Sequence, residues 1–237
     1  MRKFFAPITV LVIMMVIQTG ATVVTSIPGG TVIAMPAIDY FGSGPASFGA
    51  GSFAGTWTST NSFNNGGSVF GYSGTFGPYV FGGNGQWTGV LGPMAGLNDS
   101  FDDPNSGVTD TMTFSFAKPV SAVGGLLNYV PGASTPTTIA VYDSHGNLIE
   151  APFTLTFLTG GGNDSGSFFG FSESTANISY FTLTDNFVGI TNLTAAVPEP
   201  SSLLLIGTGL LGLVGYSRRC LSLKPISRYA RSEAGHP

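Results

Sequence analysis

The feature that most constrains the fold is an alternation of apolar and polar residues in the second half of residues 22–197. It occurs in short segments that are separated by glycine, proline and asparagine. An alternating segment presents one apolar face, as a half-buried β-strand does. We predict strands at Val108–Phe116, Val120–Val130, Thr137–Tyr142, Phe153–Leu158, Phe168–Phe171, Ile178–Leu183 and Phe187–Leu193. With no helical pattern between them, they predict a mainly β fold, an antiparallel, jelly-roll-like β-sandwich.

Two further details of this pattern concern its breaks and turns. Pro119 has no amide N–H to donate to a strand ladder, so we expect the first of these strands to end before it. The sequence from Asp143 to Gly146 has the residues of a hairpin turn.

A tract rich in glycine, serine, asparagine and aromatic residues precedes these strands and includes both tryptophans, Trp57 and Trp87. This much glycine opposes a helix. Two interpretations remain: short strands joined by glycine turns, or a flexible segment that orders on contact with a partner. The aromatic content favours strands. We therefore divide the exported part into a Gly/aromatic-rich β segment, residues 22–97, and the β-sandwich strands, residues 98–196.

The N-terminus has the pattern of a signal peptide. Arg2 and Lys3 precede an apolar stretch, and Thr19-Gly20-Ala21 supplies small residues at a cleavage site. We predict a helical signal peptide, residues 1–21, that directs the chain to the Sec translocon and is cleaved after Ala21. A later cut after Ala34 and an uncleaved N-terminal anchor are the alternatives.

The C-terminal region has three consecutive parts. Pro198-Glu199-Pro200 is rigid and non-helical, because each proline fixes its own φ. Residues 203–216 are apolar and uncharged, and residues 201–217 together reach the lower limit of length for a transmembrane helix. Arg218 and Arg219 follow as a stop-transfer signal that stays on the cytoplasmic side.

This order of parts over residues 197–219 resembles the PEP-CTERM sorting signal of Gram-negative bacteria, which exosortase reads. The resemblance implies that Pro198, Glu199 and Pro200 form the recognition and processing site. It also implies a transient inner-membrane intermediate, followed by the cell surface or the extracellular space. The chain departs from the family pattern by continuing over residues 220–237, a basic tail that we predict to be cytoplasmic. The alternative is an ordinary C-terminal anchor that is not processed.

Charge is distributed unevenly along the chain. Residues 22–197 hold one base, Lys118, against ten acids, which gives this part a formal net charge of −9. A surface of this kind has no cationic groove for phosphates, so the sequence argues against a nucleic-acid partner. The only cysteine, Cys220, follows the apolar segment, and no internal disulfide is possible.

Candidate catalytic and metal-binding groups are few in the exported part. His145 is its only histidine and falls on the predicted hairpin turn, and the Gly-x-Ser-x-Gly and His-Glu-x-x-His motifs are missing. We therefore predict no enzymatic activity and no cofactor. The candidate Ca²⁺ ligands are Asp99, Asp102, Asp103 and Asp110. Because their spacing fits no EF-hand, we prefer a solvated acidic loop.

Trp57 and Trp87 have two alternative roles. Each ring could serve as an exposed platform for a sugar, or fill the core, which we favour because tryptophan is highly buried on average. The sequence thus predicts an exported, exosortase-sorted protein with a structural or adhesive role, and the resemblance links this role to exopolysaccharide or biofilm. A carbohydrate-binding module, with or without Ca²⁺, is the first alternative, and a secreted hydrolase is the second.

Overall fold

The computed structural model describes residues 20–61, 67–75, 77–98, 109–133, 135–185 and 187–198. Several sequence predictions lie outside these ranges: the signal helix, the transmembrane helix, the tail, and Asp99, Asp102, Asp103, Glu199, Pro200, Arg218 and Arg219. Within the described ranges, no helix is long and apolar enough to cross a membrane. The helices that the ranges do contain are two short 3-10 turns, η1 (Gly51–Phe53) and η2 (Gly82–Asn84).

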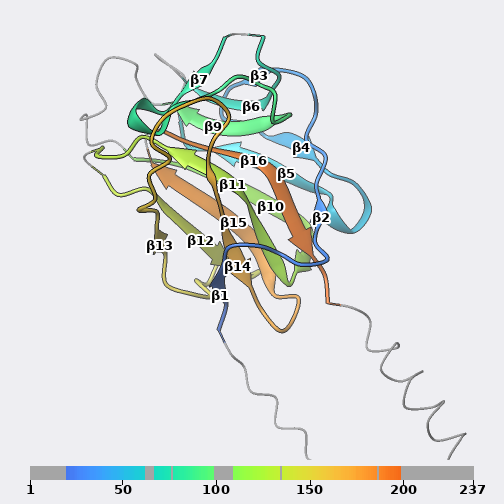
Figure 1. The fold of residues 1–237 in the computed structure, drawn as a ribbon. Helices are drawn as coiled ribbons and strands as arrows, with labels where there is room; N and C mark the ends of the chain where they lie inside the picture. Colours follow the sequence, from blue (N-terminus) through green and yellow to red (C-terminus); the bar gives the residue numbers. More distant parts are fainter. Residues whose placement is uncertain are drawn as a thin grey trace, which may run out of the picture. The chain divides into compact units, whose positions relative to one another are not determined.

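The described residues form two large sheets and a small hairpin sheet (Figure 1). The eight-stranded sheet has the spatial order β1 (Thr22–Val24), β14 (Ser167–Ser172), β11 (Ala122–Tyr129), β16 (Phe187–Ala196), β9 (Met94–Asn98), β6 (Ser68–Tyr72) and β3 (Tyr40–Phe41), and β2 (Thr31–Val32) also pairs with β16. The six-stranded sheet has the order β13 (Phe153–Thr154), β12 (Thr138–Tyr142), β15 (Ile178–Asp185), β10 (Asp110–Val120), β5 (Gly55–Ser59) and β4 (Ala46–Phe48). The hairpin sheet consists of β7 (Tyr79–Val80) and β8 (Gln86–Trp87).

Every pair of these strands is antiparallel, which confirms the prediction of a mainly β, antiparallel fold. The strands from β9 to β16 follow the order of a jelly roll, with β14-β11-β16-β9 in one sheet and β13-β12-β15-β10 in the other. Strands β6 and β3 extend the first sheet beyond β9, and β5 and β4 extend the second beyond β10. Residues 22–97 and residues 98–196 therefore build the same two sheets.

The chain passes between the two large sheets several times, and two of these connections span a single residue, from β10 to β11 and from β15 to β16. Strand β10 continues through Pro119, so the expectation that this proline ends the strand is wrong. The register between β10 and β15 shifts between Ser115 and Val120, and the proline lies within this irregularity. A position of this kind requires no ladder hydrogen bond from its backbone nitrogen.

The predicted strand Phe153–Leu158 is shorter in the structure, where only Phe153–Thr154 forms β13. Beyond β13 the chain bonds to the side chain of Asn84 in η2. Asn84 Nδ2 donates to the carbonyl oxygen of Phe157 over 3.4 Å, and the backbone N–H of Thr159 donates to Asn84 Oδ1 over 3.1 Å. The amide of Asn84 thus satisfies backbone groups that a neighbouring strand would otherwise satisfy.

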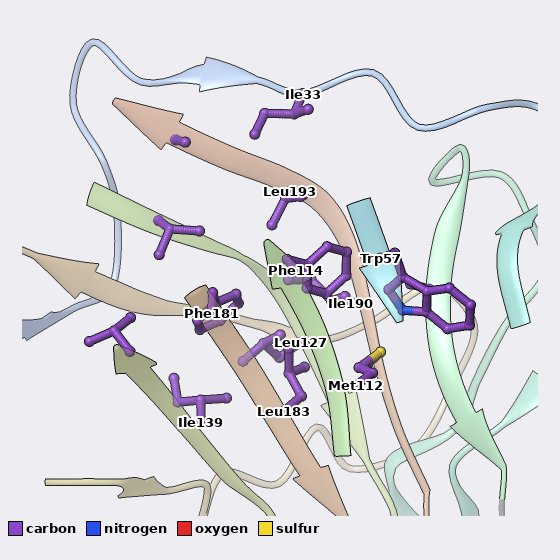
Figure 2. Close-up of a cluster of buried hydrophobic side chains, with 14 of the residues drawn as sticks. Ile33, Trp57, Met112, Phe114, Leu127, Ile139, Phe181, Leu183, Ile190 and Leu193 are labelled. Carbon is purple, nitrogen blue, oxygen red and sulfur yellow. The ribbon is translucent and has the colours of Figure 1, made fainter. Parts of the chain in front are cut away.

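The main core lies between the two large sheets. It contains Phe114 and Phe181 from the six-stranded sheet together with Leu127 and Ile190 from the eight-stranded sheet, and all four are fully buried (Figure 2). Trp57 of β5 belongs to the same cluster. Because the cluster takes side chains from both sheets, hydrophobic burial joins the two layers.

A second cluster covers the other face of the eight-stranded sheet. On β6, Phe70 belongs to the main core, whereas its neighbour Val69 belongs to this second cluster, as the alternation of a strand requires. We call it the hairpin cluster, since β7, β8 and η2 lie over it; its buried members are Val69, Tyr72, Phe81, Trp87 and Met94. Gly189 of β16 permits the contact, because a Cβ there would lie 2.8 Å from both Phe81 and Trp87.

Candidate functional site

The C-terminal end of β16 is the point where the folded domain meets the predicted sorting segment. Strand β16 lies inside the eight-stranded sheet, with β11 on one side and β9 and β2 on the other. The carbonyl oxygen of Ala196, its last residue, accepts hydrogen bonds from the backbone N–H of Ser121 over 2.8 Å and from Ser121 Oγ over 3.1 Å. Val197 follows and is 41% exposed. A single residue therefore separates the last ladder contact from Pro198.

The two ends of the predicted exported part lie in one row of cross-strand partners. Thr22 pairs with Ser172, Ser172 with Ala122, and Ala122 with Ala196. Neighbouring strands are about 4.8 Å apart, so Thr22 and Ala196 are about 14 Å apart. The start of β1 and the end of β16 consequently lie at the same end of the eight-stranded sheet (Figure 1).

The two cleavage sites that the sequence offers have different consequences for this fold. A cut after Ala21 leaves β1 and β2 in place, whereas a cut after Ala34 removes both strands. The later cut also removes Ile33, which is 5% exposed in the main core. Because β1 is paired with β14 and β2 with β16, the later cut exposes the edges of two strands. The earlier cut removes Ala21, which is 4% exposed in the main core, but it keeps both strands.

Charged groups near this junction are few among the described residues. The backbone N–H of Glu173 donates to the carbonyl oxygen of Ser121 over 2.7 Å. Burial raises the pKa of the Glu173 carboxyl above its usual value, and a hydrogen bond from Asn177 opposes that shift. Lys118, which directly precedes Pro119 on β10, is exposed. Among the described residues, backbone pairing and Ser121 hold the junction.

Residues 196–219 match the family model of the PEP-CTERM protein-sorting motif. The chain carries a PEP-CTERM motif. The match begins at Ala196, the residue at which β16 ends, so the motif starts where the folded domain stops. A PEP-CTERM motif marks an exported protein for sorting by exosortase, with the cell surface or the extracellular space as its destination. No curated protein and no solved structure matched the chain in the comparisons.

Trp57 and Trp87 are not the exposed platforms that the carbohydrate-binding hypothesis placed there. Their side chains are 0% and 1% exposed. The Trp57 ring is stacked on Phe70 with centroids 5.2 Å apart, and the Trp87 ring meets Phe81 edge-on at 4.8 Å. An aromatic platform must present its ring face to solvent, so the platform role is wrong at both positions.

Asp110 is the Ca²⁺ candidate that the described residues include. It faces Asp185 across β10 and β15, and the two residues are 7% and 0% exposed. Thr60 Oγ1 donates to Asp110 over 3.3 Å, and Thr137 Oγ1 donates to Asp185. In the described part of the chain, no group of three or more His, Cys, Asp or Glu residues gathers at one point. Asp110 is thus a buried residue of β10, and the expectation that it lies in a solvated acidic loop is wrong for this residue.

His145 lies on the hairpin turn that the sequence predicted, and its side chain is 82% exposed. The carboxylate that organises the turn is Asp143. Hydrogen bonds from the side chain and backbone of Asn147, with a further one from the backbone of His145, lower the pKa of Asp143 below its usual value. These contacts stabilise a turn and leave the imidazole in solvent.

Ser121 is the residue at the junction that the sequence analysis did not identify. Its hydroxyl bonds to the carbonyl oxygen of Ala196, which is 75 positions later in the chain. The sequence places Ser121 within the predicted strand Val120–Val130, and nothing in it reveals the partner. Only the jelly-roll order, which brings β11 beside β16, places the two residues together.

Proposed function

We propose that this chain is an exported envelope protein that exosortase processes at Pro198-Glu199-Pro200. Its β domain then has a non-enzymatic structural or adhesive role, linked to exopolysaccharide or biofilm. The observation that supports this proposal most is the PEP-CTERM motif directly after β16. Because Val197 is exposed, an enzyme can approach the tripeptide without unpairing the sheet.

The fold restricts the bonds at which the chain can be cut. Residues 187–196 are paired within the eight-stranded sheet, and a protease would have to separate β16 from β11 to reach them. Separating the end of an inner strand breaks backbone hydrogen bonds and exposes the main core. We therefore expect the new C-terminus of the processed protein at Val197 or beyond it.

Replacement of Pro198, Glu199 and Pro200 by alanine tests the proposal. The variant should remain in the inner membrane with its tail attached, whereas the wild-type chain should reach the surface without residues 218–219. The matched control replaces Ser201 and Ser202 by alanine, which changes the neighbouring residues and keeps the tripeptide. Cell fractionation followed by mass spectrometry of the intact protein distinguishes the two forms. Released wild-type protein that still contains Arg219 would contradict processing.

The sheet edges indicate how such a domain makes contacts. The edge strands β1, β3, β4 and β13 are two or three residues long. Edges this short offer few backbone groups for pairing with a second chain. Adhesion would then use loops and side chains rather than strand addition. A secreted hydrolase has the least support. The one histidine among the described residues, His145, lies on a turn with its side chain exposed to solvent.

A further inference from the structure

Two loops meet at the end of the eight-stranded sheet that is opposite Ala196. One runs from β7 through η2 to β8, and the other comprises residues 157–165. Asn128 Nδ2, near the end of β11, donates to the carbonyl oxygens of Asn84 and Ser165 over 3.0 Å each. This buried amide fixes both loops to the sheet at the same point. We call the paired loops the cradle.

The cradle is cross-linked by hydrogen bonds between its two segments. The backbone N–H of Gln86 donates to Gly162 over 2.9 Å, and the backbone N–H of Asp164 donates back to Gln86 over 2.7 Å. The carboxylate of Asp164 accepts from the backbone N–H and the Oγ1 of Thr88, over 2.7 and 2.6 Å. These bonds leave the loops little freedom, so a ligand that binds here meets a preformed surface.

Glycine sets the close approach of the two segments. At Gly85, which has φ of +85°, a Cβ would lie 2.1 Å from the carbonyl oxygen of Gly162. Gly162 itself has φ of +106°, a conformation that side chains rarely adopt. Any other residue at position 85 would force the loops apart. The glycines therefore maintain the shape of the surface between the loops.

A shallow hollow of about 240 Å³ lies between the loops. Its lining residues are Val80, Gly82, Gly85, Gln86, Gly162 and Asn163, none of which is charged. Inside it, Gln86 Nε2 donates to Asn163 Oδ1 over 2.8 Å. This one bond leaves Gln86 Oε1 as an acceptor and the Asn163 NH₂ group as a donor, and no described residue bonds to either group. Val80, half exposed, adds an apolar surface beside them.

We infer that the cradle binds a neutral saccharide. A sugar presents neighbouring hydroxyls that both donate and accept, and the free oxygen of Gln86 and the free NH₂ of Asn163 complement that pair. Val80 lines the same hollow and is half exposed, so it can contact the C–H face of a ring. An anionic sugar finds no cationic side chain in the lining, and a metal ion finds no carboxylate there.

Calorimetric titration of the purified full-length chain, held in a detergent without sugar headgroups, tests this inference. The probes are short neutral oligomers of glucose, mannose and galactose, with an oligomer of galacturonic acid for comparison. Asn163→Asp is the informative variant, since it removes the NH₂ donors and keeps the oxygen that accepts from Gln86. Gln86→Ala is the second variant, and Asn147→Ala, at an exposed amide of the hairpin turn, is the control.

We expect at least one neutral oligomer to bind. Asn163→Asp and Gln86→Ala should each weaken that binding about tenfold, because each removes hydrogen-bonding groups from the hollow. Asn147→Ala should bind like the wild type. The inference is overturned if no neutral oligomer binds, if the galacturonic acid oligomer binds more tightly, or if Asn163→Asp binds normally. Sorting plays no part in this assay, so its outcome is independent of exosortase processing.

Discussion

The main core and the hairpin cluster each bury one tryptophan, but they hold it differently. In the main core, Trp57 is stacked on Phe70 and meets Tyr40 edge-on, and its buried indole N–H has no acceptor among the described residues. In the hairpin cluster, Trp87 donates its indole N–H to the carbonyl oxygen of Ser165 over 2.7 Å. The main core thus relies on packing, whereas the hairpin cluster combines packing with polar links to the cradle.

We therefore expect the two clusters to affect stability differently, one across the whole domain and the other locally. The main core joins the two large sheets, so a defect there weakens the whole domain. The hairpin cluster joins one sheet to β7, β8 and the cradle, so a defect there frees the loops before the sheets separate.

The largest expected effect comes from removal of the two rings. Trp57→Ala should lower the free energy of unfolding by about 3–5 kcal/mol, because it leaves a cavity in a core with no disulfide to support it. Trp87→Ala should cost about 2–3 kcal/mol, because the hairpin layer can loosen while the large sheets persist. Chemical denaturation measures both values, and hydrogen exchange should show faster exchange at residues 82–88 and 160–165 in Trp87→Ala alone. Equal global losses with no local difference would remove the distinction between the clusters.

Replacement of each tryptophan by phenylalanine keeps an aromatic ring and removes the indole N–H, so it tests the contribution of that donor in each cluster. Trp57→Phe removes a buried donor that has no acceptor, which offsets part of the lost packing. Trp87→Phe removes a donor that is bonded to Ser165. We therefore expect Trp87→Phe to be more destabilising than Trp57→Phe by about 1 kcal/mol, measured by denaturation of both variants under one condition. The opposite order would show that ring volume outweighs the hydrogen bond.

Glu173→Gln should give the smallest effect and serves as a reference away from both clusters. Because burial raises the pKa of Glu173, the folded state favours the protonated carboxyl, and stability falls as pH rises from the usual glutamate pKa through the raised value. Glutamine removes this loss and should stabilise the protein near pH 7, by no more than about 0.5 kcal/mol because the group is largely solvated. The gain should vanish at a pH below the usual glutamate pKa. Thermal melts at both pH values measure it, and a gain that persists in acid would contradict the assigned cause.

The sequence predicted strands in the second half of the chain well, because alternation is a local property. Predicted Val120–Val130 corresponds to Ala122–Tyr129, and predicted Phe187–Leu193 lies within β16. The exceptions depend on distant partners: Pro119 is tolerated by a register shift with β15, and the chain after Thr154 bonds to Asn84. In the Gly/aromatic-rich segment, the strand interpretation was correct for β3 to β9.

The candidate sites likewise differ in whether they depend on consecutive residues or on distant partners. The sorting tripeptide was recognisable because its parts are consecutive in the chain, and the family model matches the same residues. The core role favoured for Trp57 and Trp87 is confirmed. It rested on the average burial of tryptophan, since threonine and glycine surround both residues in sequence and the covering side chains come from elsewhere. The Gln86–Asn163 pair joins residues 77 positions apart, and no local pattern indicates it.

The position of β16 has a consequence for the timing of export. It is the last strand of the domain, yet it lies between β11 and β9. When the chain crosses a membrane with its N-terminus first, β1 emerges long before its partner β14, and the eight-stranded sheet lacks an inner strand until residues 187–196 arrive. We therefore expect the sheet to be completed only after residues 187–196 have crossed, directly before the PEP-CTERM motif reaches the membrane.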